Sequence, residues 1–321
     1  MPESLRLTVI IPTHRPHPER LRRTLAGLRQ QTLPASGWET LLVDNASPIP
    51  VELAPLAEAA PPNLRISREP KLGLTTARIH GITRARGAVL VFVDDDNVLA
   101  PRYLESALRV MEGDPRVGAA GGPVEPEWES PPPAWLPRFH GLLALQNHGP
   151  DRRVARGGAG APWPPFAPVG AGLVVRRSAA ENYVRAVDDD SIRGSLDRQA
   201  GRLSSGGDCD LVFTVLHAGG DVVYEPELHV THLIPHGRMQ PEYLARLNAG
   251  IMQSWVQVLA LHGQCPWPAI PRWTVPLRSA RAWWRRRAWT SPAARINWAG
   301  DCGQFAGQAD LAVRRPKTSA R

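Results

Sequence analysis

The sequence lacks several features that would assign it at once to a familiar class of protein. Its three cysteines, Cys209, Cys265 and Cys302, do not have metal-ligand spacing, and their odd count favours a reduced compartment. No apolar run approaches the roughly 18–20 residues that span a bilayer. Strand-like sequence is reached by Leu7, so we expect no signal peptide. These absences favour a cytoplasmic protein.

Motifs of common nucleotide and zinc enzymes are missing as well. No G-x-G-x-x-G follows the first predicted strand, which argues against a dinucleotide oxidoreductase, and no G-x-x-x-x-G-K-[ST] indicates a P-loop enzyme. Neither H-E-x-x-H nor C-x-x-C occurs, so a zinc site is not expected.

The positive charge is concentrated near the end of the chain. Residues 271–321 contain 11 Lys or Arg and 2 Asp or Glu, whereas residues 1–270 contain 27 Lys or Arg and 28 Asp or Glu. A nearly neutral main part argues against a nucleic-acid-binding core. Five of the 11 tryptophans lie in the basic stretch, and the mixture from Arg281 to Trp289 suits an anionic membrane surface. The alternatives are a solvated basic helix or tryptophans packed on the body.

Short apolar runs alternate with amphipathic stretches in the first third of the chain. The runs predict strands at Leu5–Ile11, Thr40–Val43, Leu64–Ser67 and Ala88–Val93, and the helical periodicity predicts helices at Pro18–Gln31, Leu74–Ala85 and Pro101–Glu112. This order indicates an α/β protein with a mainly parallel sheet and crossover helices. In such sheets ligands bind beyond the carboxyl ends of the strands.

The later part of the chain has weaker patterns. It predicts strands at Val117–Gly121, Gly172–Val175 and Val222–Tyr224, a helix at Asp208–Ala218, and helical sequence from Pro241. We expect ordered loops with little regular structure from Glu125 to Pro168, and a loop from His229 to Arg238.

The strongest local signal is Ala88–Asn97, where six apolar residues run into Asp94, Asp95 and Asp96. Adjacent carboxylates repel one another, and a divalent cation with oxygen ligands compensates them. In an extended segment Asp94 and Asp96 point the same way, so both can face one ion while Asp95 turns elsewhere. The alternative is a solvated turn before the next helix. A second acidic triplet, Asp188–Asp190, follows no buried strand, and we interpret it as solvated.

Four other side chains are candidates for binding or catalysis. Asp44 ends a strand, where it can accept hydrogen bonds from a ribose or base. The alternative is that it stabilises an ordinary turn. Arg78 can bind a phosphate bidentately, or be an exposed helix arginine. Asp208 follows two glycines at a helix start, where it can be a general base or an N-cap. His232, three residues after His229, can bind a metal or phosphate, or be structural.

Taken in order, these segments resemble the motifs of family 2 glycosyltransferases, which have the GT-A fold. The segments are Val9–Thr13, Val43–Ser47, Gly73–Arg78, Phe92–Asn97, Ser205–Leu211, Tyr224–Pro226 and His232–Pro235. The resemblance implies a GT-A domain over residues 1–246, with a nucleotide-binding half at 1–122 and an acceptor half at 123–246. Residues 247–321 would form a basic, Trp-rich helical appendage whose tail need not be ordered.

The resemblance also implies roles for individual residues. Pro12, Thr13, Asp44 and Arg78 would hold the nucleotide, and Asp95 would touch its ribose.

The remaining roles concern the metal and the chemistry. Asp94 and Asp96 would form a D-x-D motif that binds Mn²⁺ or Mg²⁺, with His232 near the metal or the diphosphate. Asp208 would be the catalytic base for inverting attack at the anomeric carbon.

Two departures from the family pattern matter. Gly207 stands where the family usually has Glu, so one carboxylate beside the base is missing. The Gln-x-x-Arg-Trp of processive members is absent, because Ala269 occupies the glutamine position before Arg272-Trp273. A single-addition transferase is therefore expected.

The predicted activity is transfer of one sugar from a nucleotide-diphosphate sugar to a hydroxyl of a glycan or lipid-linked acceptor, in cell-surface polysaccharide or glycolipid synthesis. The protein would be cytoplasmic and would lie peripherally on the inner face of the membrane. One alternative is a non-catalytic GT-A-like protein that binds a glycan or lipid carrier at the membrane. Another is a sugar nucleotidyltransferase, but that class needs a Gly-rich loop where Pro12–Pro16 has no glycine.

Overall fold

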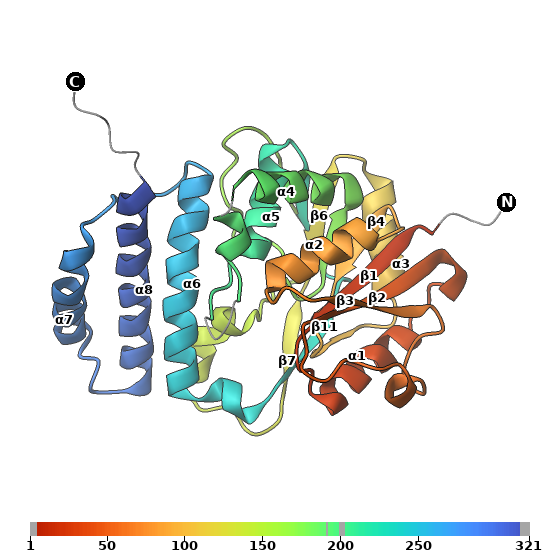
Figure 1. Cartoon of the computed structure of the whole chain (residues 1–321), viewed down its shortest axis with the longest axis horizontal. Helices are drawn as coiled ribbons and strands as arrows, with labels where there is room; N and C mark the ends of the chain where they lie inside the picture. Colours follow the sequence, from red (N-terminus) through yellow and green to blue (C-terminus); the bar gives the residue numbers. More distant parts are fainter. Residues whose placement is uncertain (1–4, 191, 199–202, 315–321) are drawn as a thin grey trace.

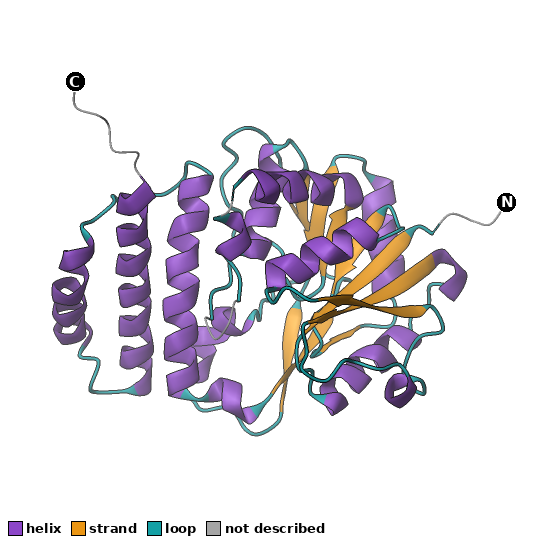
Figure 2. Cartoon of the chain, in the orientation of Figure 1, coloured by secondary structure: helices purple, strands orange, loops and turns teal. Residues whose placement is uncertain are grey.

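The structure is a computed structural model, and it describes residues 5–190, 192–198 and 203–314. Two β-sheets with helices packed on them are followed by a region whose described secondary structure elements are all helices (Figures 1 and 2). No helix in these described ranges is long and apolar enough to cross a membrane.

The larger sheet has eight strands among the described residues. Their order is β3 (Leu64–Glu69), β2 (Trp38–Asn45), β1 (Leu7–Thr13), β4 (Val89–Phe92), β9 (Leu173–Arg176), β6 (Val117–Gly121), β10 (Asp221–Tyr224) and β8 (Arg153–Ala155). The pairs β2–β3, β1–β2, β1–β4 and β6–β10 are parallel, whereas β9 and β8 pair antiparallel with their neighbours. This sheet confirms the predicted α/β class and agrees with the GT-A fold.

Strand β1 is buried on both faces because helices cover both sides of the sheet. Leu7, Val9 and Ile11 belong to one core, and Ile10 belongs to the other, as the alternation of a strand requires. Helices α2 (Leu74–Arg84), α4 (Arg177–Asp189) and α5 (Gly207–His217) cover one face, and α1 (Pro18–Arg29) and α3 (Tyr103–Gly113) cover the other.

A second, smaller sheet corrects the predicted loop from His229 to Arg238. Its strands are β5 (Asn97–Leu99), β11 (Val230–Ile234) and β7 (Val124–Trp128). Strand β11 lies between the other two, parallel to β7 and antiparallel to β5. The polar residues Thr231 and His232 interrupt the apolar pattern, so only pairing with distant segments identifies the strand. Strand β7 likewise corrects the start of the predicted Glu125–Pro168 loop region.

The last three helices form a layer beside the sheets. Helix α8 (Pro292–Arg314) packs along α6 (Pro241–Leu261), and α7 (Val275–Arg286) packs on α8 and lies outermost (Figure 1). The predicted helical appendage is therefore present, although the proposed boundary after residue 246 falls inside α6. Whether the tail of this appendage is ordered stays a prediction, because residues 315–321 lie outside the described residues.

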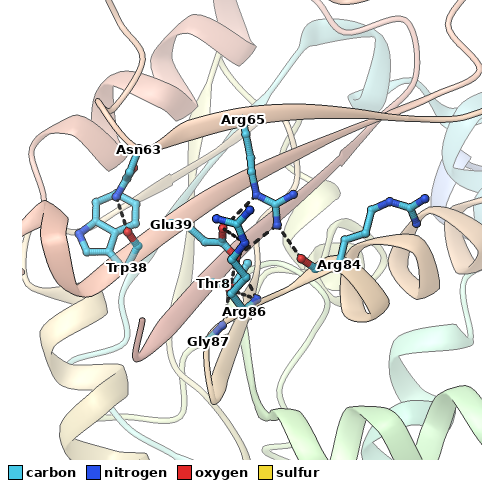
Figure 3. A network of polar contacts seen from close by, with 8 residues as sticks. All are labelled: Thr8, Trp38, Glu39, Asn63, Arg65, Arg84, Arg86 and Gly87. Carbon is cyan, nitrogen blue, oxygen red and sulfur yellow. Dashed lines mark hydrogen bonds and ion pairs between the residues drawn. The ribbon is translucent and has the colours of Figure 1, made fainter. Parts of the chain in front are cut away.

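A network of buried polar contacts ties the amino ends of the parallel strands together (Figure 3). The Glu39 carboxylate accepts hydrogen bonds from Thr8 Oγ1 at 2.9 Å, Arg65 Nε at 2.9 Å and the Arg86 backbone N–H at 2.9 Å. Gly87 N–H in turn donates to Thr8 Oγ1 at 2.9 Å. These contacts fix β1, β2, β3 and the loop before β4 at the end opposite their carboxyl termini.

Candidate active site

The carboxyl ends of β1, β2 and β4 open into a cleft with a volume of about 640 Å³. Pro12 and Thr13 from β1, Asn45 from β2 and the residues Asp94–Asp96 after β4 line it. Gly170, just before the antiparallel strand β9, completes this edge. The convergence follows from parallel pairing, which brings the ends of separate strands to one side of a sheet.

The acidic triplet lines this cleft in a turn that Asn97 N–H closes by donating to the Asp94 carbonyl at 3.1 Å. Asp94 and Asp95 are half-buried, so the turn is not fully solvated. Asp96 is only 2% exposed. The Thr13 hydroxyl donates a hydrogen bond to Asp95 Oδ2, so Asp95 faces the end of β1. Asp94 lines the cleft between these groups and Arg78. The triplet is thus a turn and not the extended segment that the prediction assumed, and Asp95 and Asp96 contact different groups.

Burial and mutual repulsion shift the acids in opposite directions. Burial, then the charge of Asp96, raises the pKa of Asp94. The same two causes raise the pKa of Asp95 to about 7, although the Thr13 hydrogen bond opposes the shift. Burial also acts to raise the pKa of Asp96, but Arg238 and His232 outweigh it, and the pKa of Asp96 lies below its usual range. The negative charge of the triplet is thus only partly compensated by this chain.

His232 and Arg238 meet Asp96 from the other side of the cleft. Arg238 Nη2 lies 2.9 Å from Asp96 Oδ2, and Arg238 Nη1 lies 3.0 Å from His232 Nε2. His232 Nδ1 lies 3.0 Å from the Leu143 carbonyl, which is an acceptor, so Nδ1 carries a proton. His232 Nε2 is 3.5 Å from Asp96 Oδ1, so both groups face one position.

These donor atoms suit a hard divalent cation, but the fit is partial. Carboxylate oxygens with one imidazole nitrogen match the ligands that Mn²⁺ accepts. Within the described ranges, however, no group of three or more His, Cys, Asp or Glu side chains is arranged to hold a metal ion. The guanidinium of Arg238 is the cation that balances Asp96 and contacts His232.

Arg78 is buried, which excludes the exposed helix arginine. It is 5% exposed, lines the cleft, and donates from Nη1 to Asp197 Oδ2 at 3.0 Å. Burial acts to lower the pKa of Arg78, but the charges of Asp197, Asp208 and Asp94 outweigh burial and raise this pKa above its ordinary value. The side chain therefore stays protonated. A fixed positive charge therefore lies between the acidic triplet and the predicted base.

Asp208 lies in the first turn of α5 and faces the cleft. Its Oδ2 accepts a hydrogen bond from the Gly170 backbone N–H at 2.9 Å, and its Oδ1 accepts one from Cys209 N–H at 2.9 Å. The N-cap of α5 is Gly206, and Asp208 is not the cap. Backbone donors of this kind fix the direction of the carboxylate.

Asp197 fills the space beside Gly207 and was not identified from the sequence. It accepts hydrogen bonds from Thr75 Oγ1 at 3.0 Å and from the Gly206 and Gly207 backbone N–H groups at 3.2 and 2.9 Å. A Cβ added at Gly207 would lie 2.2 Å from Asp197 Oδ2. The Asp197 carboxylate thus occupies the space into which a side chain at position 207 would extend.

Asp44 has a different setting from the other predicted nucleotide-binding residues. It is buried, its Oδ1 accepts from Ser47 N–H at 3.1 Å, and its Oδ2 accepts from Val51 N–H and Arg68 Nη1, both at 3.3 Å. It does not line the cleft, whereas its neighbour Asn45 does. The turn chemistry that was the alternative for Asp44 accounts for these contacts.

One wall of the cleft is apolar. It is formed by Leu143 from the 3₁₀ segment Leu136–Leu143 and by Tyr243, Leu247 and Ile251 from α6. The three α6 residues are spaced by four, which places them on one side of the helix. The cleft is therefore polar at the strand ends and apolar opposite them.

No individual role was predicted from the sequence for Arg238, Asp197 or Asn45. Asn45 Oδ1 accepts from Gly73 N–H at 2.8 Å, and its Nδ2 donates to the Lys71 carbonyl at 2.8 Å, which holds the loop before α2. The only local signal was proximity to a motif, because Asn45 follows Asp44 and Arg238 follows the His232 segment. Asp197 had no such signal.

Comparison with known proteins agrees with the resemblance. The family described as "Glycosyl transferase family 2" matches residues 8–184, more than half of the chain. The chain is 36% identical over 110 residues to the succinoglycan biosynthesis protein ExoW of Rhizobium meliloti (strain 1021), which covers 33% of this chain and 34% of that protein.

Two proteins of Haloferax volcanii are similar over comparable stretches. The identity is 35% over 121 residues to glycosyltransferase AglE, covering 37% of this chain and 39% of that protein. It is 30% over 78 residues to a glucosyl-dolichyl phosphate glucuronosyltransferase, covering 24% of this chain and 25% of that protein. The matches thus span less than two fifths of each relative.

Proposed function

The chain belongs to glycosyltransferase family 2, and from this premise we propose that it transfers one sugar from a nucleotide-diphosphate sugar to an acceptor hydroxyl with inversion. The observation that carries the proposal is the placement of Asp208 and the Asp94–Asp96 triplet on one cleft, with the buried charge of Arg78 between them. Family membership also favours a transferase over the non-catalytic binding protein considered above.

The strand ends would bind the nucleotide. Thr13 and Asp95 already form a hydrogen-bonded pair at the end of β1. The resemblance implies that Asp95 would contact the ribose of the nucleotide. Pro12 supplies backbone beside them, and Arg78 lies deeper, where its charge can attract a phosphate oxygen. Asp44 would act through the turn that it holds, since its side chain is not on the cleft surface.

The protein residues that would hold a metal are Asp96, with Asp94 and His232 beside it. Bound Mn²⁺ or Mg²⁺ would neutralise the diphosphate leaving group. The uncompensated negative charge of the triplet supports this proposal. Because the protein ligands are incomplete by themselves, we expect the diphosphate oxygens to complete the set, so that metal and donor bind together.

Asp208 would accept the proton of the acceptor hydroxyl. The acceptor oxygen forms a bond to the anomeric carbon, the bond from that carbon to the diphosphate breaks, and the proton passes to the carboxylate. The N–H groups of Gly170 and Cys209 hold the carboxylate in one orientation for this step. Inversion follows because the attacking and leaving oxygens lie on opposite sides of the carbon.

We propose a glycan or lipid-linked sugar as the acceptor. The apolar wall formed by Leu143, Tyr243, Leu247 and Ile251 supports an acceptor with an apolar part. One relative is named for action with glucosyl-dolichyl phosphate, and another for succinoglycan biosynthesis. A role in cell-surface polysaccharide or glycolipid synthesis is proposed on the same basis.

A nucleotide screen combined with a variant of the base tests the proposal. Thermal shifts with nucleotide diphosphates, with and without Mn²⁺, should identify one nucleotide whose stabilisation requires the metal. Sugar transfer or donor hydrolysis is then measured for wild type, Asp208→Asn, and the exposed control Asp188→Asn. We expect Asp208→Asn to lose about 100- to 10,000-fold in rate, while keeping the thermal shift. No activity of the wild type with any common donor, or full activity of Asp208→Asn, would contradict the mechanism.

A further inference from the structure

Four large apolar side chains on α7 and directly beside it, here called the apolar stripe, are mostly exposed. Trp273, Leu277, Trp284 and Trp289 are 74%, 68%, 71% and 52% exposed. Leu277 and Trp284 are seven residues apart, two helical turns, so they lie on one side of the helix. The rings of Trp284 and Trp289 meet edge to face at 5.0 Å. Ala282, on the opposite side of α7, is buried.

A row of arginines lies beside the apolar stripe. Arg278, Arg281 and Arg285 line a groove of about 640 Å³ between α7 and α8. Arg285 Nη2 lies 3.2 Å from Asp301, which also pairs with Arg286 at 2.8 Å. For Arg278 and Arg281, the described residues contain no carboxylate partner within ion-pair distance. Much of the positive charge of this groove is therefore uncompensated.

The distribution of charge along the whole chain also places the excess positive charge near α7. Residues 271–313 contain seven arginines and two aspartates, whereas residues 1–270 are nearly neutral. Helix α7 lies at the outer edge of the molecule, on the far side of α8 from the sheets (Figure 1). A negatively charged surface would therefore attract the molecule with α7 foremost.

Charge decides among possible occupants of this face. A second copy of the chain placed face to face would bring the same arginines together, so self-association is opposed. Exposed tryptophans favour the interface between water and lipid, and arginines pair with lipid phosphates. We propose that the α7 face, the apolar stripe with its row of arginines, binds peripherally to a bilayer containing anionic phospholipid.

This inference goes beyond the proposed transferase activity and does not depend on it. Binding would rest on insertion of Trp284 and Leu277 into the headgroup region and on attraction between Arg278, Arg281 and the phosphates. Both contributions come from residues outside the cleft. The two contributions respond to different substitutions, and salt should weaken only the electrostatic one.

Vesicle sedimentation of the full chain tests the proposal. Wild type should sediment with vesicles of equal parts phosphatidylglycerol and phosphatidylcholine, and should stay in the supernatant with phosphatidylcholine alone. Arg278→Gln with Arg281→Gln should reduce partitioning about 30-fold, at about 1 kcal/mol per arginine near the surface. Trp284→Ala should reduce it at least about tenfold. High salt should weaken binding of the wild type.

The matched control removes two exposed arginines from the main domain, Arg84→Gln with Arg185→Gln, and should partition as wild type does. All variants change exposed side chains, so melting curves should coincide and exclude unfolding as the cause. Equal partitioning into the two kinds of vesicle would overturn the proposal. So would equal losses from the control and the α7 arginines, or unchanged binding by Trp284→Ala.

Discussion

At the scale of single residues, the buried carboxylate of Asp197 accounts for a glycine at position 207. It receives hydrogen bonds from α2 and from the start of α5, and it pairs with Arg78. A glutamate at position 207 would place a second side chain in the same space. Asp197 therefore leaves room at position 207 only for a residue without a Cβ.

Substitution of Gly207 by alanine tests this close approach. The added Cβ would lie 2.2 Å from Asp197 Oδ2, and Asp197 cannot move without losing hydrogen bonds. We expect Gly207→Ala to lower the free energy of unfolding by about 1–3 kcal/mol, as overpacking of a filled site does. Chemical denaturation measures the change.

The matched control is Gly113→Ala at the end of α3, where an added Cβ meets no atom within 4 Å. It should leave stability nearly unchanged. Equal effects at the two positions would show that the Asp197 contact does not restrict residue 207.

At the scale of elements, polar contacts tie the strands at the end of the sheet away from the cleft (Figure 3). Burial acts to raise the pKa of Glu39, but hydrogen bonds from Arg65, Thr8 and the Arg86 backbone outweigh it and lower that pKa below its usual range. The network thereby holds the register of β1 and β2, whose opposite ends carry Thr13 and Asn45. The network affects the cleft only by fixing the positions of these strands.

The lowered pKa of Glu39 predicts a pH-dependent contribution to stability. A carboxylate whose folded pKa lies below its unfolded value stabilises the protein above the unfolded pKa, about 4.3 for Glu, and loses that effect as pH falls through the folded pKa. Glu39→Gln should therefore cost about 1–3 kcal/mol near neutral pH, and less in acid. Unfolding measured across this range gives both values.

Glu19→Gln provides the control for this prediction. Glu19 pairs with Arg22 on the surface of α1, where such pairs contribute little. We expect a much smaller change at neutral pH than for Glu39→Gln. A constant difference between Glu39→Gln and wild type at every pH would show that ionisation of Glu39 does not contribute.

The contact between α6 and α8 connects the cleft wall to the outer helices. A Cβ added at Gly303 of α8 would lie 2.1 Å from the Ala249 carbonyl of α6, so the two helices approach closely at this point. We expect Gly303→Val to lower the melting temperature because it must separate the helices. Ala312→Val, at an exposed position of the same helix, is the control and should change it little. Equal melting temperatures for the two variants would contradict the close packing.

At the scale of the whole molecule, the cleft and the excess positive charge lie in different places. The cleft lies at the sheet edge and on α6, whereas the arginines gather on α7, beyond α8 (Figure 1). The described part of the molecule can therefore lose charge on α7 without a change at the strand ends.

This separation predicts that Arg278→Gln with Arg281→Gln keeps the metal-dependent thermal shift with the nucleotide identified in the screen. The two arginines lie outside the cleft lining, so donor binding should equal that of wild type within error. Differential scanning fluorimetry measures it. Loss of the nucleotide shift in this variant would show that the α7 face and the cleft are coupled.

The sequence by itself determined the α/β class, most of the predicted strands and helices, and the candidates Asp94–Asp96 and Asp208. These features rest on local patterns: a buried strand is a continuous apolar run, and a motif keeps its spacing along the chain. Asp94, Asp95, Asp96 and Asp208 all line the cleft for this reason. Their roles in binding and catalysis stay predictions for the experiments above.

Only the tertiary structure decided which side chains compensate those acids. Asp197 and Arg78 are 119 residues apart, and Arg238 reaches Asp96 from a segment whose strand β11 is defined by pairing with β7 and β5. Asp44, by contrast, turns away from the cleft to hold its own loop. Contacts between distant segments leave no periodic trace in a sequence, because each segment's pattern reflects burial and not the identity of its partner.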